Sequence, residues 1–383
     1  MIKYWLGYEF PIELILDFGN YSLFCLIFFY FYKKKLFNQN LFFLLCFFML
    51  TPFLFNNFFI DWKLSPDQSK YLSITNQIRN GTFNENYYNN PNIKVIISGY
   101  LFSFFPLISI ETFKSVGFLN RFILLVTTVY LFKKNNIDLK LFLLVILTPS
   151  LTYFSSIFLR ETLILVLMIW SIYFILEKNY FYSIIPLSIL SLIKFQNFLI
   201  ILVFLYLNFI FNFKKKFAFI IINIIVVIVV MYFYGDILLQ EFNSRRQGMY
   251  FENFGNYKGI TSNATYKNLD VNLDLIIITL KSIALFVLSP IFSSMSWLKL
   301  LIFLETIILY IFFVRDFLIE KNPKLKSIII LWFIILLFSF VMYSLAVFND
   351  GTIHRFRLNL IFFVLFGYNM HKFNFLKKKL HDG

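Results

Sequence analysis

Long apolar runs separated by short lysine-rich blocks recur along the whole chain, and they limit what it can fold into. Of the 383 residues, 60% are hydrophobic and only 14% are charged, and the mean hydropathy is +0.75. Soluble domains average about 45–50% apolar and about 25% charged residues, and a folded chain of this size exposes a large share of its surface. A soluble enzyme, a disordered chain and a disulfide-stapled secreted domain are therefore excluded. We interpret the sequence as an all-helical, multi-span membrane protein.

The apolar runs give the predicted membrane spans. A helix needs about 20 predominantly apolar residues to cross the hydrocarbon core of a bilayer, with a range of about 17–25. Two apolar runs, Ile93–Ile110 and Leu273–Phe292, are left aside because hydropathy alone does not assign them. The predicted spans are Ile12–Tyr32, Leu41–Ile60, Val116–Phe132, Leu139–Ser156, Thr162–Leu176, Phe181–Ile193, Phe198–Phe213, Phe217–Tyr234, Trp297–Val314, Ile328–Phe348 and Leu358–Met370.

Basic residues beside the runs predict the topology, because cytoplasmic loops carry an excess of Lys and Arg. If both unassigned runs crossed the membrane, the Lys133–Lys134 pair and the Arg315–Lys326 loop would lie on opposite sides. If both stay at the outer side as interfacial or re-entrant helices, every basic block is cytoplasmic. We therefore predict about eleven spans with the N-terminus outside and the C-terminus inside. The net charge of +15 then reflects these blocks and not a nucleic-acid partner.

The connections predict where a site is assembled. We expect a single polytopic domain over residues 1–383, with two long external segments at 61–115 and 235–296. Elsewhere the connections are a few residues long, so these segments are the places for a binding or catalytic site. Cys25 and Cys46 both lie inside apolar runs, which provides neither a disulfide framework nor a cysteine metal site.

Ionisable side chains recur near the predicted outer ends of the spans. Such groups are costly near membrane depth, and they usually face a cavity and are paired. A cluster of Arg and Lys suits a phosphate or diphosphate headgroup, because Arg binds it through two hydrogen bonds and Lys as a point charge. A nearby carboxylate can accept a proton. The candidates are Asp67 as the catalytic base, Arg160, Lys194, Arg355 and Arg357 as phosphate ligands, and Asp61, Tyr71, Glu161, Gln196, Arg245 and Arg246 as further substrate contacts.

Each candidate also has a purely structural interpretation. Asp67 is a good N-cap for a short helix that ends near Asn80-Gly81. Lys194 can extend to lipid headgroups, and an Arg160–Glu161 pair is ordinary at a membrane interface. Arg355 and Arg357 can anchor the last span, and His354 is interpreted as structural. The case for a site rests on several separate parts of the chain delivering a cation to one face.

The sequence lacks several motifs that would bind a soluble nucleotide or a catalytic metal. The sequence has no Gly-rich nucleotide loop, no His-based zinc motif and no nucleophile elbow. The cytoplasmic connections are too short to hold a nucleotide-binding domain. If the chain is a transferase, its donor is therefore expected to be carried by a lipid and reached from the membrane.

Over roughly residues 40–200, the chain resembles the C-type glycosyltransferase (GT-C) superfamily. The first external segment is similar to the family pattern of an acidic residue, a Tyr four positions later and a short helix ending in Gly, here Asp67, Tyr71 and Gly81. Arg121, the Pro149–Glu161 segment and Lys194 are similar to later family features. The family commonly has a second acidic residue where this chain has Gln68. This departure leaves Asp67 as the sole acidic candidate there, and it disfavours the metal-assisted form of the family's mechanism. Leu288–Pro290 and Asn349–Arg357 instead resemble O-antigen polymerase-like proteins.

The resemblance implies a function. It implies an inverting transfer of a sugar from a polyprenyl-phosphate-linked donor to a cell-surface glycan or lipid acceptor, at the outer face of a bacterial inner membrane. Asp67 would deprotonate or orient the acceptor hydroxyl, and the cations would bind the phosphate. No metal ligand is assigned, although a divalent cation is left open as a cofactor. The alternatives are an oligosaccharide repeat-unit polymerase or ligase that depends on paired arginines, and a transporter of lipid-linked saccharides.

Overall fold

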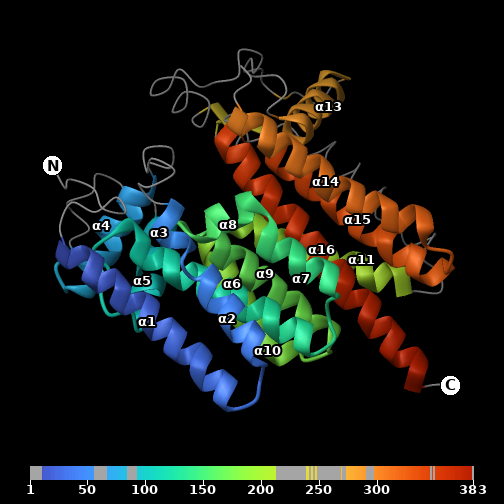
Figure 1. Ribbon diagram of the computed structural model, residues 1–383. Coiled ribbons are helices and arrows are strands. Elements are labelled where there is room, and N and C mark those ends of the chain that lie inside the picture. Colours follow the sequence, from blue (N-terminus) through green and yellow to red (C-terminus); the bar gives the residue numbers. More distant parts are fainter. Residues whose placement is uncertain are drawn as a thin grey trace. The chain divides into compact units, whose positions relative to one another are not determined.

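The computed structural model describes residues 11–55, 67–83, 93–212, 239–240, 243–244, 246–247, 269, 273–289, 297–345, 347 and 350–381. Every regular element in these ranges is a helix (Figure 1). The all-helical prediction is therefore confirmed for this part of the chain. Asp61, Arg245 and the predicted span Phe217–Tyr234 lie outside the described residues, as do large parts of both predicted external segments.

The chain divides into two compact units. Unit 1 comprises Met1–Asn197 with Phe373–Gly383, and unit 2 comprises Phe198–Lys372. Unit 1 contains α1 (Pro11–Lys33), α2 (Gln39–Phe48), α3 (Thr51–Phe55), α4 (Asp67–Arg79), α5 (Ile93–Phe104), α6 (Phe113–Lys133), α7 (Leu139–Leu147), α8 (Pro149–Ser155), α9 (Glu161–Leu176) and α10 (Tyr180–Ile193). Unit 2 contains most of α11 (Phe195–Asn212), α13 (Leu273–Leu288), α14 (Trp297–Ile319), α15 (Pro323–Ser344) and α16 (Asp350–His381) up to Lys372.

The helices support a membrane protein. In the described residues, three stretches are long and apolar enough to cross a bilayer: Ile12–Lys33, Phe113–Lys133 and Pro323–Ser344. Several shorter apolar helices coincide with other predicted spans, among them α9 and α10. The number of eleven spans and their orientation stay predictions.

Two predicted spans are each divided into two helices. Leu41–Ile60 begins as α2 and α3, and Leu139–Ser156 becomes α7 and α8. The second break follows from Pro149, because a proline lacks the N–H donor and disfavours the helical region for the residue before it. Thr148 accordingly has an extended backbone, with φ −66° and ψ 113°. The Thr152 hydroxyl donates to the carbonyl oxygen of Ile146 at 3.2 Å, which replaces a lost backbone bond.

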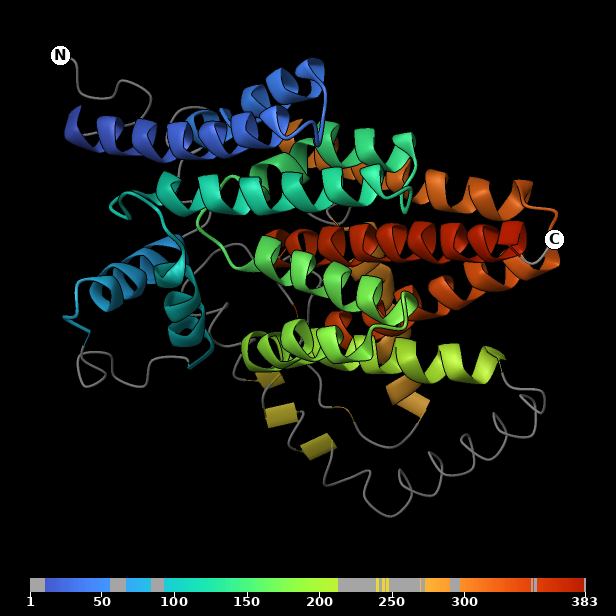
Figure 2. The same cartoon turned by 90° about the horizontal axis from the view of Figure 1, so that it is seen from below.

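Helix α6 lies beside α1 and α9 in unit 1 (Figure 2), and it carries the connection between α8 and α9. Gly117 permits a close approach, because a Cβ atom there would lie 2.2 Å from the carbonyl oxygen of Ser156. Asn120 is fully buried, and its Nδ2 donates to the carbonyl oxygens of Ile157 at 3.0 Å and Leu159 at 2.7 Å. The α8–α9 connection is therefore fixed on α6.

A second polar contact fixes the connection between α5 and α6. Asp17 of α1 is fully buried and accepts a hydrogen bond from the Ser115 hydroxyl at 2.9 Å. Asn20, one turn later, donates to the carbonyl oxygen of Ser109 at 2.9 Å and accepts from the N–H of Ile108 at 2.8 Å. These polar side chains of α1 thus hold the segment that leads into α6.

Unit 2 packs around a buried tryptophan. Trp332 of α15 is fully buried and stacks on Phe204 of α11, with ring centroids 4.9 Å apart. A Cβ atom at Gly367 of α16 would lie 2.0 Å from the Trp332 ring. Glycine is therefore required there for α15 and α16 to approach this closely.

Candidate functional site

Several predicted site residues of unit 1 lie where helix ends meet. Helices α9 and α10 pack as a hairpin with a three-residue connection. Lys194, the C-cap of α10, therefore lies at the same end as Arg160, the N-cap of α9. Helix α4 reaches this end through Gln68, whose Oε1 accepts a hydrogen bond from the N–H of Phe158 at 3.0 Å. We call Asp67, Gln68, Tyr71, Arg160 and Lys194 the Arg160 site.

Two buried amides hold the segment that presents Arg160. Gln68 contacts this segment from α4, and Asn120 contacts it from α6. Both side chains are completely shielded from solvent. Because buried hydrogen bonds of this kind favour one geometry, the backbone leading to Arg160 is fixed from two sides.

The Arg160 guanidinium has hydrogen-bonding capacity left over. Its central carbon lies 5.9 Å from the ring centroid of Tyr71, within the range of a cation–π contact. Its Nε and Nη1 atoms are buried and have no hydrogen-bond partner among the described residues, and the same holds for Nε2 of Gln68. Buried donors are nearly always bonded in folded proteins. Donors of this kind at one end of a unit suit an anionic group such as a phosphate.

Other predicted residues are placed around the Arg160 site. Asp67 is the first residue of α4 and lies one helical turn before Tyr71, on the same face. Glu161 is buried in the first turn of α9, where a negative charge is favourable. Gln196 follows Lys194 by two residues in the first turn of α11, and its buried Oε1 accepts no hydrogen bond from the described residues.

Arg357 in unit 2 has a different environment. It is fully buried, and its Nη1 donates to the carbonyl oxygens of Phe286 and Val287, both at 2.9 Å, and of Ser289 at 2.6 Å. Its Nη2 donates to the Thr306 hydroxyl oxygen at 3.1 Å. These three carbonyl groups lie at the C-terminal end of α13, where the last carbonyl groups of a helix have no partner within the helix and an arginine can satisfy them. Arg357 therefore connects α13, α14 and α16.

The other predicted residues of unit 2 also have contacts with neighbouring groups of the same unit. Arg246 is buried, and its Nε donates to the carbonyl oxygen of Leu345 at 2.6 Å. Arg355 is half-buried, with its guanidinium carbon 5.3 Å from the ring centroid of Phe356. His354 lies 3.5 Å from Arg357 through Nδ1, which accepts because a guanidinium only donates. The predicted cations thus fall into two groups, with Arg160 and Lys194 in unit 1 and Arg246, Arg355 and Arg357 in unit 2.

Several polar residues that organise unit 1 were not predicted as site residues. They are Asp17, Asn20 and Asn120, and each is a polar side chain within an apolar run. Arg121, which the sequence analysis noted only as similar to a family feature, is fully buried. It donates through Nη1 to the Ser155 hydroxyl at 3.0 Å. Rare polar residues in such runs are the signal that could have found them.

Comparisons with protein-family models, with curated proteins and with solved structures give no match to this chain. Among the described residues, no group of three or more His, Cys, Asp and Glu side chains is placed to hold a metal ion.

Proposed function

We propose that the chain is a membrane glycosyltransferase. It transfers a sugar from a polyprenyl-phosphate-linked donor to a cell-surface glycan or lipid acceptor, at the outer face of a bacterial inner membrane. The observation that carries the proposal is Arg160, whose buried Nε and Nη1 have no partner in the described structure while its segment is held by Gln68 and Asn120. An arginine arranged in this way is suited to bind the phosphate of the donor.

The proposed reaction uses three side chains. The acceptor hydroxyl oxygen attacks the anomeric carbon of the sugar while the bond from that carbon to the phosphate oxygen breaks. Asp67 takes the hydroxyl proton, and the products are the glycosylated acceptor and the polyprenyl phosphate. Arg160 and Lys194 stabilise the negative charge that develops on the phosphate, and this stabilisation is often the largest single contribution to catalysis.

The first test compares variants for transfer of label. Purified protein in lipid receives a radiolabelled polyprenyl-phosphate sugar and a cell-envelope acceptor extract. We expect Asp67→Asn and Lys194→Ala to lose transfer while remaining folded. Asp316→Asn, on α14, and Lys140→Ala, an exposed residue on α7, are matched controls that should retain it.

Each contrary outcome has a defined meaning. Undiminished transfer by Asp67→Asn removes Asp67 from the chemistry and favours the arginine-dependent polymerase. Movement of the lipid-linked saccharide across vesicles by wild-type protein, without formation of a new glycosidic bond, favours the transporter.

A further inference from the structure

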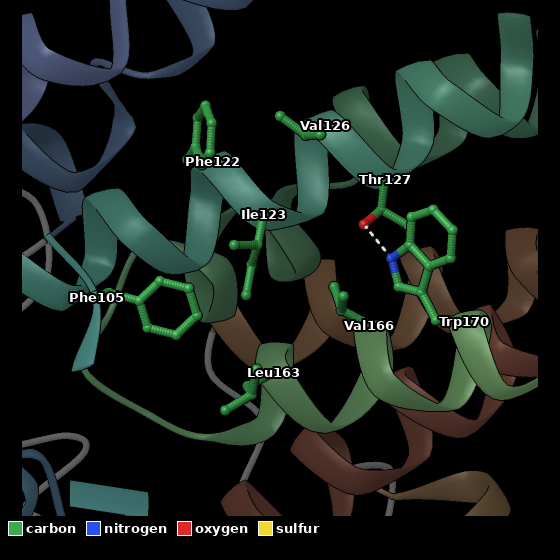
Figure 3. A pocket seen from close by; sticks show the side chains of 8 residues that line it. All are labelled: Phe105, Phe122, Ile123, Val126, Thr127, Leu163, Val166 and Trp170. Carbon is green, nitrogen blue, oxygen red and sulfur yellow. Dashed lines mark hydrogen bonds between the residues drawn. The ribbon is translucent and has the colours of Figure 1, made fainter. Parts of the chain in front are cut away.

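Unit 1 has an apolar pocket between α6 and α9, separate from the polar groups of the Arg160 site. Its volume is about 240 Å³, and it is a shallow depression that is more open than enclosed. Pockets that enclose a whole drug-sized ligand measure about 300–1,000 Å³, so this pocket suits a segment of a longer molecule. Figure 3 shows the lining side chains, which are Phe105, Phe122, Ile123, Val126, Thr127, Leu163, Val166 and Trp170.

The chemistry of the lining favours a hydrocarbon. Only Thr127 and Trp170 carry polar side-chain atoms there, and Nε1 of Trp170 donates to the Thr127 hydroxyl oxygen at 3.1 Å (Figure 3). These two polar side chains thus bond to each other at one end of the pocket (Figure 3). The other six side chains offer aromatic and aliphatic surface, which fits an alkyl or isoprenoid chain better than a sugar.

The pocket follows α9 from the end that carries Arg160. Leu163 lies about one helical turn after Arg160, and Trp170 lies ten residues after it. At about 1.5 Å per residue, the distance from Arg160 to Trp170 along the helix is about 15 Å. This is about half the thickness of the hydrocarbon core of a bilayer. A lipid phosphate on Arg160 would therefore have its chain beside the pocket.

We propose that this pocket holds the first units of the hydrocarbon chain of a polyprenyl phosphate whose phosphate contacts Arg160. The inference rests on the proposed function and adds the path of the donor chain. Charge complementarity between Arg160 and the phosphate, and the position of the lining residue Leu163 about one helical turn after Arg160 on α9, select an anionic lipid as the occupant.

The expected effect of the pocket on affinity is moderate. Moving a chain from lipid into an apolar pocket has little hydrophobic driving force, because both surroundings are apolar. The gain comes from packing against side chains such as Phe105. Filling the pocket should therefore weaken binding of a long-chain lipid by about 3–10-fold, whereas the position of the chain can be detected directly by cross-linking.

The cross-linking experiment uses two adjacent phenylalanines. Phe105→p-benzoylphenylalanine places a photoreactive group in the pocket, and the same replacement at Phe104, which is 92% exposed, is the control. After irradiation in nanodiscs that contain polyprenyl phosphate, we expect a polyprenyl phosphate adduct at position 105 that excess polyprenyl phosphate with a different isotopic label displaces. At position 104 we expect adducts with bulk phospholipid. Equal bulk-phospholipid adducts at both positions would overturn the proposal.

A binding experiment separates the pocket from the phosphate site. Val126→Trp fills the pocket, and Val314→Trp, at a 49% exposed residue of α14, is the matched control. We expect Val126→Trp to weaken binding of polyprenyl phosphate but not of glycerol phosphate, which has no chain, and Arg160→Ala to weaken both. If only Arg160→Ala has an effect, the pocket is not the chain site and the proposed function stands. If Val126→Trp alone has an effect, the chain site stands and Arg160 loses its role.

Discussion

Arg160 and Arg357 look alike in the sequence, where each is a cation beside an apolar run, but their surroundings in the two units differ. The terminal nitrogens Nη1 and Nη2 of Arg357 are bonded to three carbonyl oxygens and a hydroxyl within unit 2. In the described structure of unit 1, Nε and Nη1 of Arg160 have no hydrogen-bond partner, and its guanidinium carbon lies 5.9 Å from the centroid of the Tyr71 ring. An arginine is therefore a candidate anion ligand where protein groups leave Nε and a terminal nitrogen unfilled, as at Arg160, and a structural group where protein groups fill both terminal nitrogens, as at Arg357.

The largest effect is expected from removing Arg357. Arg357→Met deletes the donor of several hydrogen bonds and leaves the carbonyl oxygens at the end of α13 without it. An unsatisfied buried polar group costs about 1–3 kcal/mol, so the loss of stability should be about 3–5 kcal/mol. Thermal unfolding in detergent measures it as a lower Tm. A variant with an unchanged Tm would remove the structural role of Arg357.

The corresponding change in unit 1 should affect activity instead of stability. Arg160→Met removes charge stabilisation of the leaving phosphate and should lower kcat/KM for transfer by about 10²–10³-fold, or about 2.7–4 kcal/mol. Its Tm should stay close to that of the wild type, because no described hydrogen bond of the guanidinium is lost. A fall in Tm equal to that of Arg357→Met would erase the difference between the two arginines.

Gln68 should act on Arg160 through the backbone. Gln68→Leu removes the acceptor for the N–H of Phe158, which should cost about 1–3 kcal/mol of stability and lower transfer about tenfold by displacing Arg160. Gln68→Glu keeps an acceptor oxygen and should retain more activity than the leucine variant. Parallel measurements of Tm and transfer rate check this order, and equal activity in both variants would contradict the positioning role.

The smallest effect is expected at Thr306, one of several acceptors of Arg357. Thr306→Val should cost about 0.5–1.5 kcal/mol, the net contribution of one hydrogen bond. A double-mutant cycle with Arg357→Met should show a coupling free energy, because the two side chains are in contact. Additive losses of stability would mean that the Thr306–Arg357 bond contributes nothing.

The sequence predicted more of the fold than of the site. Long apolar runs placed α1, α6 and α15 within a few residues, because the length of a span is set by the thickness of the bilayer. The break at Thr148 was not predicted, although Pro149 provides the physical reason for it. Pro149 was noted only for its resemblance to a family segment.

Within the site, the charged residues could be found but their partners could not. The α9–α10 hairpin brings Arg160 and Lys194 to one end, as expected of antiparallel neighbours. That Arg357 is bonded internally depends on contacts with residues about 50–70 positions away in the sequence, which no local pattern reveals. Gln68 was noted as a departure from a family pattern, whereas its amide fixes the segment before Arg160.

The most direct test of the central claim is equilibrium binding of a radiolabelled polyprenyl phosphate to the protein in nanodiscs. Arg160→Met is compared with Arg315→Met, the same substitution at an exposed arginine of α14. We expect the Arg160 variant to lose about 10–100-fold in affinity, which corresponds to losing about one or two charge-assisted hydrogen bonds. The Arg315 variant should bind as the wild type does. Equal affinity of all three proteins would contradict the claim that Arg160 holds the lipid phosphate.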